Sequence, residues 1–472
     1  MTLNESGRTA GLMSFLSALL VTACGVPANT ASLETVSDAI SVRTARGVPT
    51  SLESVDDCAV PADVDLNDGI DEEEAVAIAL WREPELAAAL ASLEVARADV
   101  ITAGELPNPR VLVLFPYGAK LGEGALSLVL DSLITRSSRV EKAQFDAAAL
   151  ADGLVTHGLD LAHRVRTSFT LLRTLRRRLA LTTAAEVVAA RLGEISVARV
   201  RAGVATESEV ATEASALGLL RDDARTIQME IERCALGLSS LLRCEPWLEA
   251  SAFVETMGDA DLPFDPRALE SCALRTRPEL SAKRFEIDAT LEREGLALAD
   301  IIKIRGILDV NQKRVESSGS GGDGKSRTHV EYEAGPGVEV DLPVFNWSKG
   351  ARAAAAATFE RQKLELRAIE SRVALEVRDA RLQLEYATTA LRGWQAEQVV
   401  NLETTVGDAS ARFAHGAASE AQVLLAKRAL LEARRREIDL QGLRRQAQVD
   451  LSRAVGCRLD RPLIAELSEI ES

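Results

Sequence analysis

The sequence predicts a mainly helical protein with a small β part, in which long antiparallel coiled-coil helices form two tandem repeats. Three observations predict this fold. Of 472 residues, 47% are hydrophobic but only 4% are aromatic, which suits closely packed long helices better than a large globular core. Apolar residues recur at heptad spacing, and motifs of the first half recur in the second. The net charge of −16 argues against nucleic acid as a partner, because nucleic acid requires a basic surface.

The N-terminus has the features of a secretory signal peptide. An arginine precedes an apolar run from Ala10 to Ala23, which is too short to remain in a bilayer as a spanning helix. The run ends in Val-Thr-Ala before Cys24, which resembles a bacterial lipobox whose cysteine is lipidated. An ordinary signal peptide followed by a chance cysteine is the alternative. We expect residues 1–23 to be removed and residues 24–69 to form a lipidated tether or wrapping arm.

Two motifs occur twice, in the same order. The motif Ala-Leu-x-x-x-Pro-Glu-Leu begins at Ala79 and again at Ala273. A longer motif contains Ala-Arg followed four residues later by glycine, at Gly203 and again at Gly416, an offset of 213 residues. We therefore divide the chain into a first structural repeat, residues 70–263, and a second, residues 264–472.

Each repeat predicts the same order of elements. A short helix begins after a capping aspartate, Asp71 or Asp265. The proline of the first motif suits the first turn of a longer helix. A β-hairpin follows, at about residues 110–131 in one repeat and about 304–342 in the other. A very long helix, a reversal at the motif glycine and a returning helix complete the repeat.

The long helices have the strongest pattern. From Ser348 to Ala414, one unbroken helix would extend about 100 Å, and its first-repeat counterpart runs from about Arg139 to Val200. Such helices require an elongated bundle or a helical barrel. A cytosolic coiled-coil scaffold is the alternative, but it would need neither a signal sequence nor extended segments. The a and d positions of the second helix form a heptad seam of Val373, Val377, Ala380, Leu384, Ala387, Leu391 and Trp394.

Apolar and acidic residues alternate in the segment before the second long helix. This period of two predicts a strand with one face toward lipid and one toward water. With three further extended segments, we expect four strands of roughly 8–11 residues. A soluble sheet half-buried on the helices is the alternative. The acidic members would face a lumen and favour cations, or simply solvate a polar face; they are Glu331, Glu333, Glu339 and Asp341.

Four strands cannot close into a barrel. An open sheet edge in lipid would leave backbone groups without hydrogen bonds, at several kcal/mol each. If these strands lie in a membrane, several copies of the chain must therefore share one barrel.

Catalytic and metal sites are not expected. The cysteines after Cys24 form no C-x-x-C pair and have no histidine at ligand spacing. The four histidines belong to no nucleophile–base constellation, and no glycine-rich phosphate loop follows a strand. We expect no enzymatic activity and no cofactor. Cys244 and Cys457 occupy equivalent positions; an oxidising compartment could join them, but we expect free thiols.

Over about residues 70–457, the chain resembles the TolC-like outer-membrane factor family. The resemblance rests on the duplicated motifs, on Leu-Pro-Asn-Pro at residues 106–109, and on Gly-Pro-Gly-Val-x-Val-x-Leu-Pro-Val-Phe-Asn at residues 335–346. It implies a homotrimer in which each protomer gives four strands to a twelve-stranded outer-membrane β-barrel, continued by an α-helical barrel through the periplasm. It also implies a passive exit duct without cofactors.

The partners that the resemblance implies are a periplasmic adaptor protein, an inner-membrane pump and outer-membrane lipid. Lipid-anchored members mostly serve resistance-nodulation-division pumps, to which Cys24 points. The outer-membrane component of type I protein secretion, or a periplasmic coiled-coil adaptor or structural lipoprotein without a channel, are the alternatives.

The resemblance places adaptor docking at the helix tips, with a plain helix–helix turn as the alternative. The sequence departs from the family at Ala417, where an aliphatic residue is usual. It also departs at Gln422 and Leu425, which stand where better-known members carry acidic gate residues, while Glu209 occupies the first of these places in the first repeat. We therefore do not expect a strong acidic gate. The implied docking residues are Arg199, Gly203, Val204, Arg412 and Gly416.

Overall fold

The computed structural model describes residues 31–50, 61, 64, 69–116, 121–243, 266–299, 301–317, 327–344 and 347–459. The chain divides into two compact units. The first comprises residues 1–32, 92–151 and 281–367, and the second comprises residues 33–91, 152–280 and 368–472.

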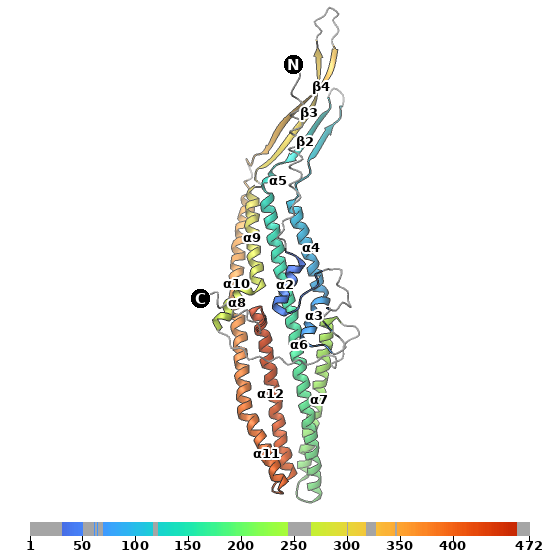
Figure 1. The fold of residues 1–472 in the computed structure, drawn as a ribbon, viewed down its shortest axis with the longest axis vertical. Helices are drawn as coiled ribbons and strands as arrows, with labels where there is room; N and C mark the ends of the chain where they lie inside the picture. Colours follow the sequence, from blue (N-terminus) through green and yellow to red (C-terminus); the bar gives the residue numbers. More distant parts are fainter. Residues whose placement is uncertain are drawn as a thin grey trace, which may run out of the picture. The chain divides into compact units, whose positions relative to one another are not determined.

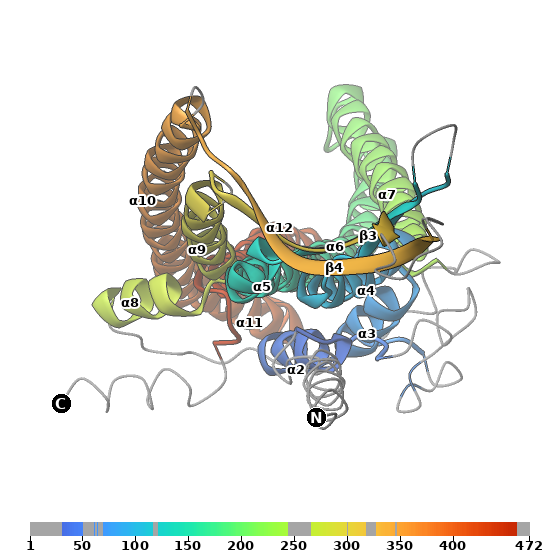
Figure 2. The same cartoon turned by 90° about the horizontal axis from the view of Figure 1, so that it is seen from above.

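The first unit contains one antiparallel sheet with the strand order β1-β2-β3-β4. Figure 1 shows these strands side by side, and Figure 2 shows that β4 is curved. The hairpins of both repeats therefore join through the pairing of β2 with β3. The strands are β1 (Arg110–Leu114), β2 (Glu123–Val129), β3 (Lys303–Ser317) and β4 (Arg327–Asp341).

The expected strand lengths were wrong. The first two strands have 5 and 7 residues, whereas β3 and β4 have 15 residues each. The polar run Asn311–Arg314 interrupts the alternation in β3, although the backbone pairing with β4 continues to Ser317. Backbone hydrogen bonds, which are independent of side-chain polarity, thus extend this hairpin beyond its apolar half.

Two prolines start helices, as the motif predicts. Pro84 begins α4 (Pro84–Gly104), and Pro278 begins α9 (Pro278–Ala299). In the first unit, Arg136 Nε donates to the carbonyl of Gly104 at 2.8 Å. This bond satisfies an orphan carbonyl at the end of α4 and ties it to the start of α6 (Arg136–Arg201), which follows the short helix α5 (Asp131–Ile134).

The long helices are confirmed. Helix α6 has 66 residues, and the second long helix runs as α10 (Lys349–Trp394), a π-helical turn η4 (Gln395–Val399) and α11 (Val400–Ala414). In its heptad seam, Leu384 and Trp394 are half-buried and the other members are buried. Trp394 also donates from Nε1 to the carbonyl of Ala433 at 2.9 Å.

The returning helices reproduce the duplication residue for residue. Helices α7 (Glu207–Leu242) and α12 (Glu420–Val455) have 36 residues each. Both end on a left-handed residue, Arg243 with φ 50° and Gly456 with φ 79°, which satisfies the last carbonyls. The positions of these two caps differ by the same offset as the two motif glycines.

The short helices are α3 (Glu72–Arg82) and α8 (Pro266–Thr276). Asp71 caps α3 as predicted: its carboxylate accepts from the Glu74 amide at 2.7 Å, while Glu74 accepts from the Asp71 amide at 2.9 Å. This reciprocal capping box satisfies two otherwise orphan donors. Asp265, the expected cap of α8, lies outside the described residues.

Residues 24–69, for which a tether or a wrapping arm was expected, contain a packed helix. Helix α2 (Leu33–Thr44) is packed, with Val36 1% and Ile40 0% exposed. Gly158 in α6 provides the space, because a Cβ there would lie 2.8 Å from Ile40 Cδ1. The apolar residues of this segment show only weak helical periodicity, so the sequence did not predict the helix. The absence of a side chain at Gly158 in α6 allows α2 to pack against α6 at this point.

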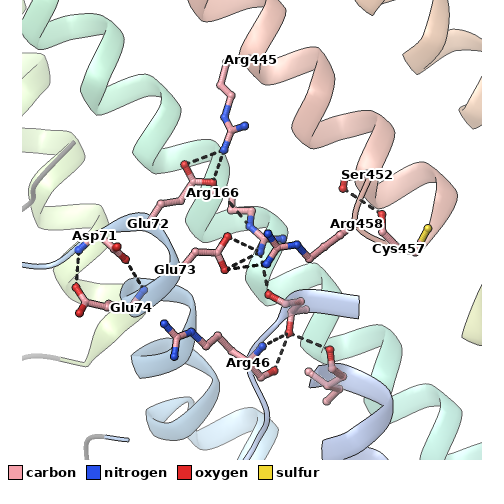
Figure 3. A network of polar contacts seen from close by, with 12 residues as sticks. Arg46, Asp71, Glu72, Glu73, Glu74, Arg166, Arg445, Ser452, Cys457 and Arg458 are labelled. Atoms are coloured by element: carbon pink, nitrogen blue, oxygen red, sulfur yellow. Dashed lines mark hydrogen bonds and ion pairs between the residues drawn. The ribbon is translucent and has the colours of Figure 1, made fainter. Parts of the chain in front are cut away.

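An ion-pair cluster joins α3, α6 and α12 in the second unit (Figure 3). Arg166 contacts Glu73 at 3.2 Å, and Arg445 contacts Glu72 at 2.8 Å. Arg458, just beyond α12, adds a contact to Glu73 at 3.6 Å. All five side chains are at least two-thirds buried, so water screens these pairs less than surface pairs.

Candidate functional site

The sheet of the first unit separates side chains into two faces. The register pairs Leu126 with Leu308, Leu308 with Pro336, and Val111 with Leu126. Because alternate residues of a strand share a face, one face of the sheet is apolar across all four strands as far as Val310, beyond which Gln312 and Arg314 of β3 lie on the same face. Its large members are exposed, and they include Val111, Val113, Leu128, Leu308, Val310, Val330, Tyr332, Val338 and Val340.

The opposite face carries the four acidic residues of β4 together with basic neighbours. Arg305 lies 3.1 Å from Glu339 and 3.3 Å from Asp341. Lys313 lies 4.0 Å from Glu333, and His329 lies 2.8 Å from Glu331. The sequence analysis did not include these partners, of which Arg305 and Lys313 offset part of the negative charge of the polar face.

Both outer edges of the sheet lack a partner strand within the described part of the chain. Strands β1 and β4 each pair on one side only, with β2 and β3 respectively. The edge of β4 is 15 residues long, and its apolar side chains are exposed, with Val338 at 68%. Such an edge is a template for pairing with another chain.

The two tips of the second unit have the same backbone structure. Gly203 and Gly416 have φ of +74° and +71°, the left-handed conformation predicted for the reversal. In each tip, the residue after the glycine donates its amide to the carbonyl of the motif arginine: Val204 to Arg199 at 3.0 Å and Ala417 to Arg412 at 2.8 Å.

The side chains of the tips differ between the repeats. Arg199 Nη1 donates to Glu209 Oε2 at 3.2 Å. Glu209, the one acidic residue at the positions that correspond to the family's gate residues, is therefore paired with an arginine. Gln422 completes a capping box with Ser419, and Leu425 is exposed. Val204 is also exposed, at 65%. Each tip therefore offers an arginine and a glycine turn.

Ion pairs join the two helical hairpins, which the sequence analysis missed. Arg191 of α6 contacts Glu420 of α12 at 2.8 Å, and this hydrogen bond lowers the pKa of the Glu420 carboxyl. Arg428 of α12 contacts Glu213 of α7 at 3.4 Å, and Arg435 contacts Asp223. These pairs link helices of different repeats, so no pattern within one repeat could predict them.

The described residues contain neither a membrane-spanning helix nor a cluster of metal ligands. None of the helices there combines the length and the apolar composition needed to cross a bilayer. No group of three or more histidine, cysteine or acidic residues among them could hold a metal ion. Cys24, the expected lipidation site, lies outside the described residues.

Comparison with known proteins agrees with this geometry. Residues 269–457 match the model of a family described as outer membrane efflux protein. No match was found among curated proteins. Together with the solved structures described next, the family match confirms the resemblance to TolC-like outer-membrane channels.

Three solved structures illustrate the fold. The outer membrane protein VceC of Vibrio cholerae is 17% identical, with 82% of this chain and 97% of that chain covered and a TM-score of 0.63. The MtrE outer membrane channel of Neisseria gonorrhoeae, solved in its open state, is 19% identical, with coverages of 83% and 90% and a TM-score of 0.60. The CmeC outer membrane channel of Campylobacter jejuni is 15% identical, with coverages of 87% and 92% and a TM-score of 0.59.

Proposed function

We propose that this relative of outer-membrane efflux channels is the exit duct of a tripartite efflux system. Three copies form a twelve-stranded barrel in the outer membrane and an α-helical barrel in the periplasm. The duct conducts solutes passively, and the driving force comes from an inner-membrane pump reached through a periplasmic adaptor. The similarity of the fold to the outer membrane channels MtrE and CmeC supports this proposal.

The observation that carries the proposal is the sheet with one exposed apolar face and two unpartnered edges. Lipid chains can cover the apolar face without an unfavourable free energy. They cannot form hydrogen bonds with the outer backbone groups of β1 and β4. Pairing β1 of one copy with β4 of the next satisfies both edges. With four strands in each chain, three copies supply the twelve strands that the family resemblance implies.

The charge of the polar face predicts a weak cation preference for the pore. Replacing the four acidic residues together, with Glu331→Gln, Glu333→Gln, Glu339→Gln and Asp341→Asn, should abolish or reverse this preference, because lumen charges tune selectivity. Arg305→Gln should strengthen it, since Glu339 and Asp341 would lose their basic neighbour. Reversal potentials of purified protein in planar bilayers under a salt gradient measure both effects. An unchanged reversal potential in both variants would exclude this face as the lining of the pore.

Adaptor docking is the proposed role of the two tips. Gly203→Ala and Gly416→Ala together should weaken adaptor binding about tenfold or more. Each alanine disfavours the left-handed conformation by about 1–2 kcal/mol, so the free tips would leave the shape that the adaptor contacts and binding would have to restore it. Binding of the purified adaptor, measured by calorimetry, tests this expectation. Gly407→Ala in α11 is the matched control, because no atom lies near its Cβ position and its φ is not left-handed. Equal affinities for tip and control variants would reject docking at the tips.

Lipidation of Cys24 is proposed from the lipobox alone. The mature chain should begin at Cys24 and carry the added mass of its acyl chains, and Cys24→Ser should lack that mass. Intact-mass measurement of the purified chain decides between lipidation and an ordinary signal peptide. A mature N-terminus elsewhere would contradict the lipobox interpretation.

A further inference from the structure

Two buried cysteines meet where the second repeat begins and ends. Cys272 lies in α8 and is 1% exposed, while Cys457 lies two residues beyond the end of α12 and is 8% exposed. The Cys457 thiol is hydrogen-bonded to Cys272, and this contact lowers the pKa of Cys272 to about 7. Thr276 and the positive charge of Arg275 act in the same direction, while burial opposes them.

The surrounding contacts fix this junction. The Thr276 hydroxyl lies 3.1 Å from the carbonyl of Val455, so α8 is tied to the end of α12. Arg43 of α2 donates from Nη2 to the carbonyl of Thr276 at 3.1 Å. The Ser452 hydroxyl donates to the carbonyl of Cys457 at 3.1 Å, as Figure 3 shows. These bonds hold the backbone on both sides of the two thiols.

We propose that Cys272 and Cys457 form a disulfide bond in the mature protein. The bond would close residues 272–457, most of the second repeat, into one covalent loop and fasten the end of α12 to α8. It differs from the pairing of Cys244 with Cys457 that was weighed against free thiols in the sequence, because Cys272 is the thiol in contact with Cys457. The first repeat has no equivalent bond, since the position corresponding to Cys272 is Ile78.

The chemistry is thiol–disulfide exchange with a disulfide oxidant of the exported compartment. The Cys272 thiolate attacks one sulfur of the oxidant's disulfide, forming a mixed disulfide and releasing the other sulfur as a thiolate. Cys457 transfers its proton to water and attacks Cys272 Sγ, which displaces the second thiolate. The two cysteines are oxidised, and the oxidant is reduced to a dithiol.

Burial sets the order of events. Neither thiol is open to a protein oxidant in the folded chain, so the bond forms during folding, before α8, α12 and α2 pack together. After folding, the same burial shields the bond from reductants. A buried cystine of this kind stabilises mainly by restricting the unfolded chain.

Cys234 in α7 provides a control within the same protein. Its thiol donates to the carbonyl of Ser168 at 3.3 Å, and burial raises its pKa. In the fold, the thiol of Cys234 faces a backbone carbonyl and not a second thiol, so Cys234 should remain a free thiol under conditions in which Cys272 and Cys457 join.

The test is a peptide map of the full mature chain taken from membranes. The chain is denatured in N-ethylmaleimide without reductant and digested. We expect linked, unalkylated peptides that contain Cys272 and Cys457, with Cys234 alkylated. In a second arm, reduced chain is refolded in detergent with oxidised and reduced glutathione and mapped in the same way. Unfolding is measured separately with and without reductant, and reduction of the bond should lower the unfolding midpoint of the unmodified protein. This decrease should be absent from Cys272→Ser and Cys457→Ser and present in Cys234→Ser.

The two arms separate the possible failures, because the bond in the cell rests on the proposed export of the chain. The same link in both arms supports the proposal. Free thiols in both arms, or a link from Cys457 to Cys244, would overturn it and leave the proposed function intact. A link after refolding, with free thiols in the membrane-derived chain, would overturn the native bond and count against export.

Discussion

Replacing Val338 and Val340 of β4 by lysine is expected to remove the protein from the outer membrane. Both side chains are exposed on the apolar face of the sheet. A lysine on the lipid face of a barrel costs about 2–4 kcal/mol near the bilayer midplane, and every copy in the assembly carries both changes. The amount of chain in isolated outer membranes should fall at least about tenfold, with the remainder aggregated or degraded.

Gly335→Lys and Gly337→Lys form the matched control. They add the same charge to the same strand, but at positions that alternate with Val338 and therefore lie on the polar face. Space is available, since no atom lies within 4 Å of a Cβ at Gly335. The control should insert at near wild-type levels. Equal levels of the two double variants would show that the two faces do not separate lipid from water.

Arg277→Met is expected to cause a large loss of stability in the second unit. Arg277 is 3% exposed, and its guanidinium lies 2.5 Å from Glu376 and 3.5 Å from Glu279. Removing one partner of a buried pair costs about 3–5 kcal/mol. We expect about 3 kcal/mol, because Glu376 is partly exposed and Glu279 keeps Arg453 at 2.9 Å.

Guanidinium unfolding of the detergent-solubilised protein measures this loss. Arg275→Met is the control two residues away, since Arg275 is exposed and exposed substitutions usually change stability by less than about 0.5 kcal/mol. Similar unfolding midpoints for the two variants would show that the buried guanidinium does not stabilise the junction of α8 and α9.

The features that recur in the sequence could be predicted from it. The heptad seam from Val373 to Trp394, the capping aspartate Asp71 and the left-handed glycines at both tips each depend on local spacing. Duplication strengthened these predictions, because each motif was observed in two contexts. The two long helical hairpins follow from these features and agree with the structure.

The features that depend on long-range packing could not be predicted. Helix α2 is placed by contact with Gly158, more than a hundred residues away. After Trp394, the next buried residue of the helix is Val399, at the end of the π-helical turn η4. This step of five residues is not part of the heptad pattern, so the pattern could not predict it. Arg305 and Lys313 lie beside the acidic residues of β4 because of the β3–β4 register. This register could not be predicted, since the polar run in β3 has no alternation of apolar and polar residues from which to read it.

The most direct test of the central claim is the native mass of the mature chain extracted from outer membranes in detergent. The account predicts three times the mass of one chain, because β1 and β4 of each copy are completed by neighbouring copies. A single chain that stays soluble and monomeric without detergent would contradict it, since the sheet edges and the apolar face would then need neither lipid nor partners.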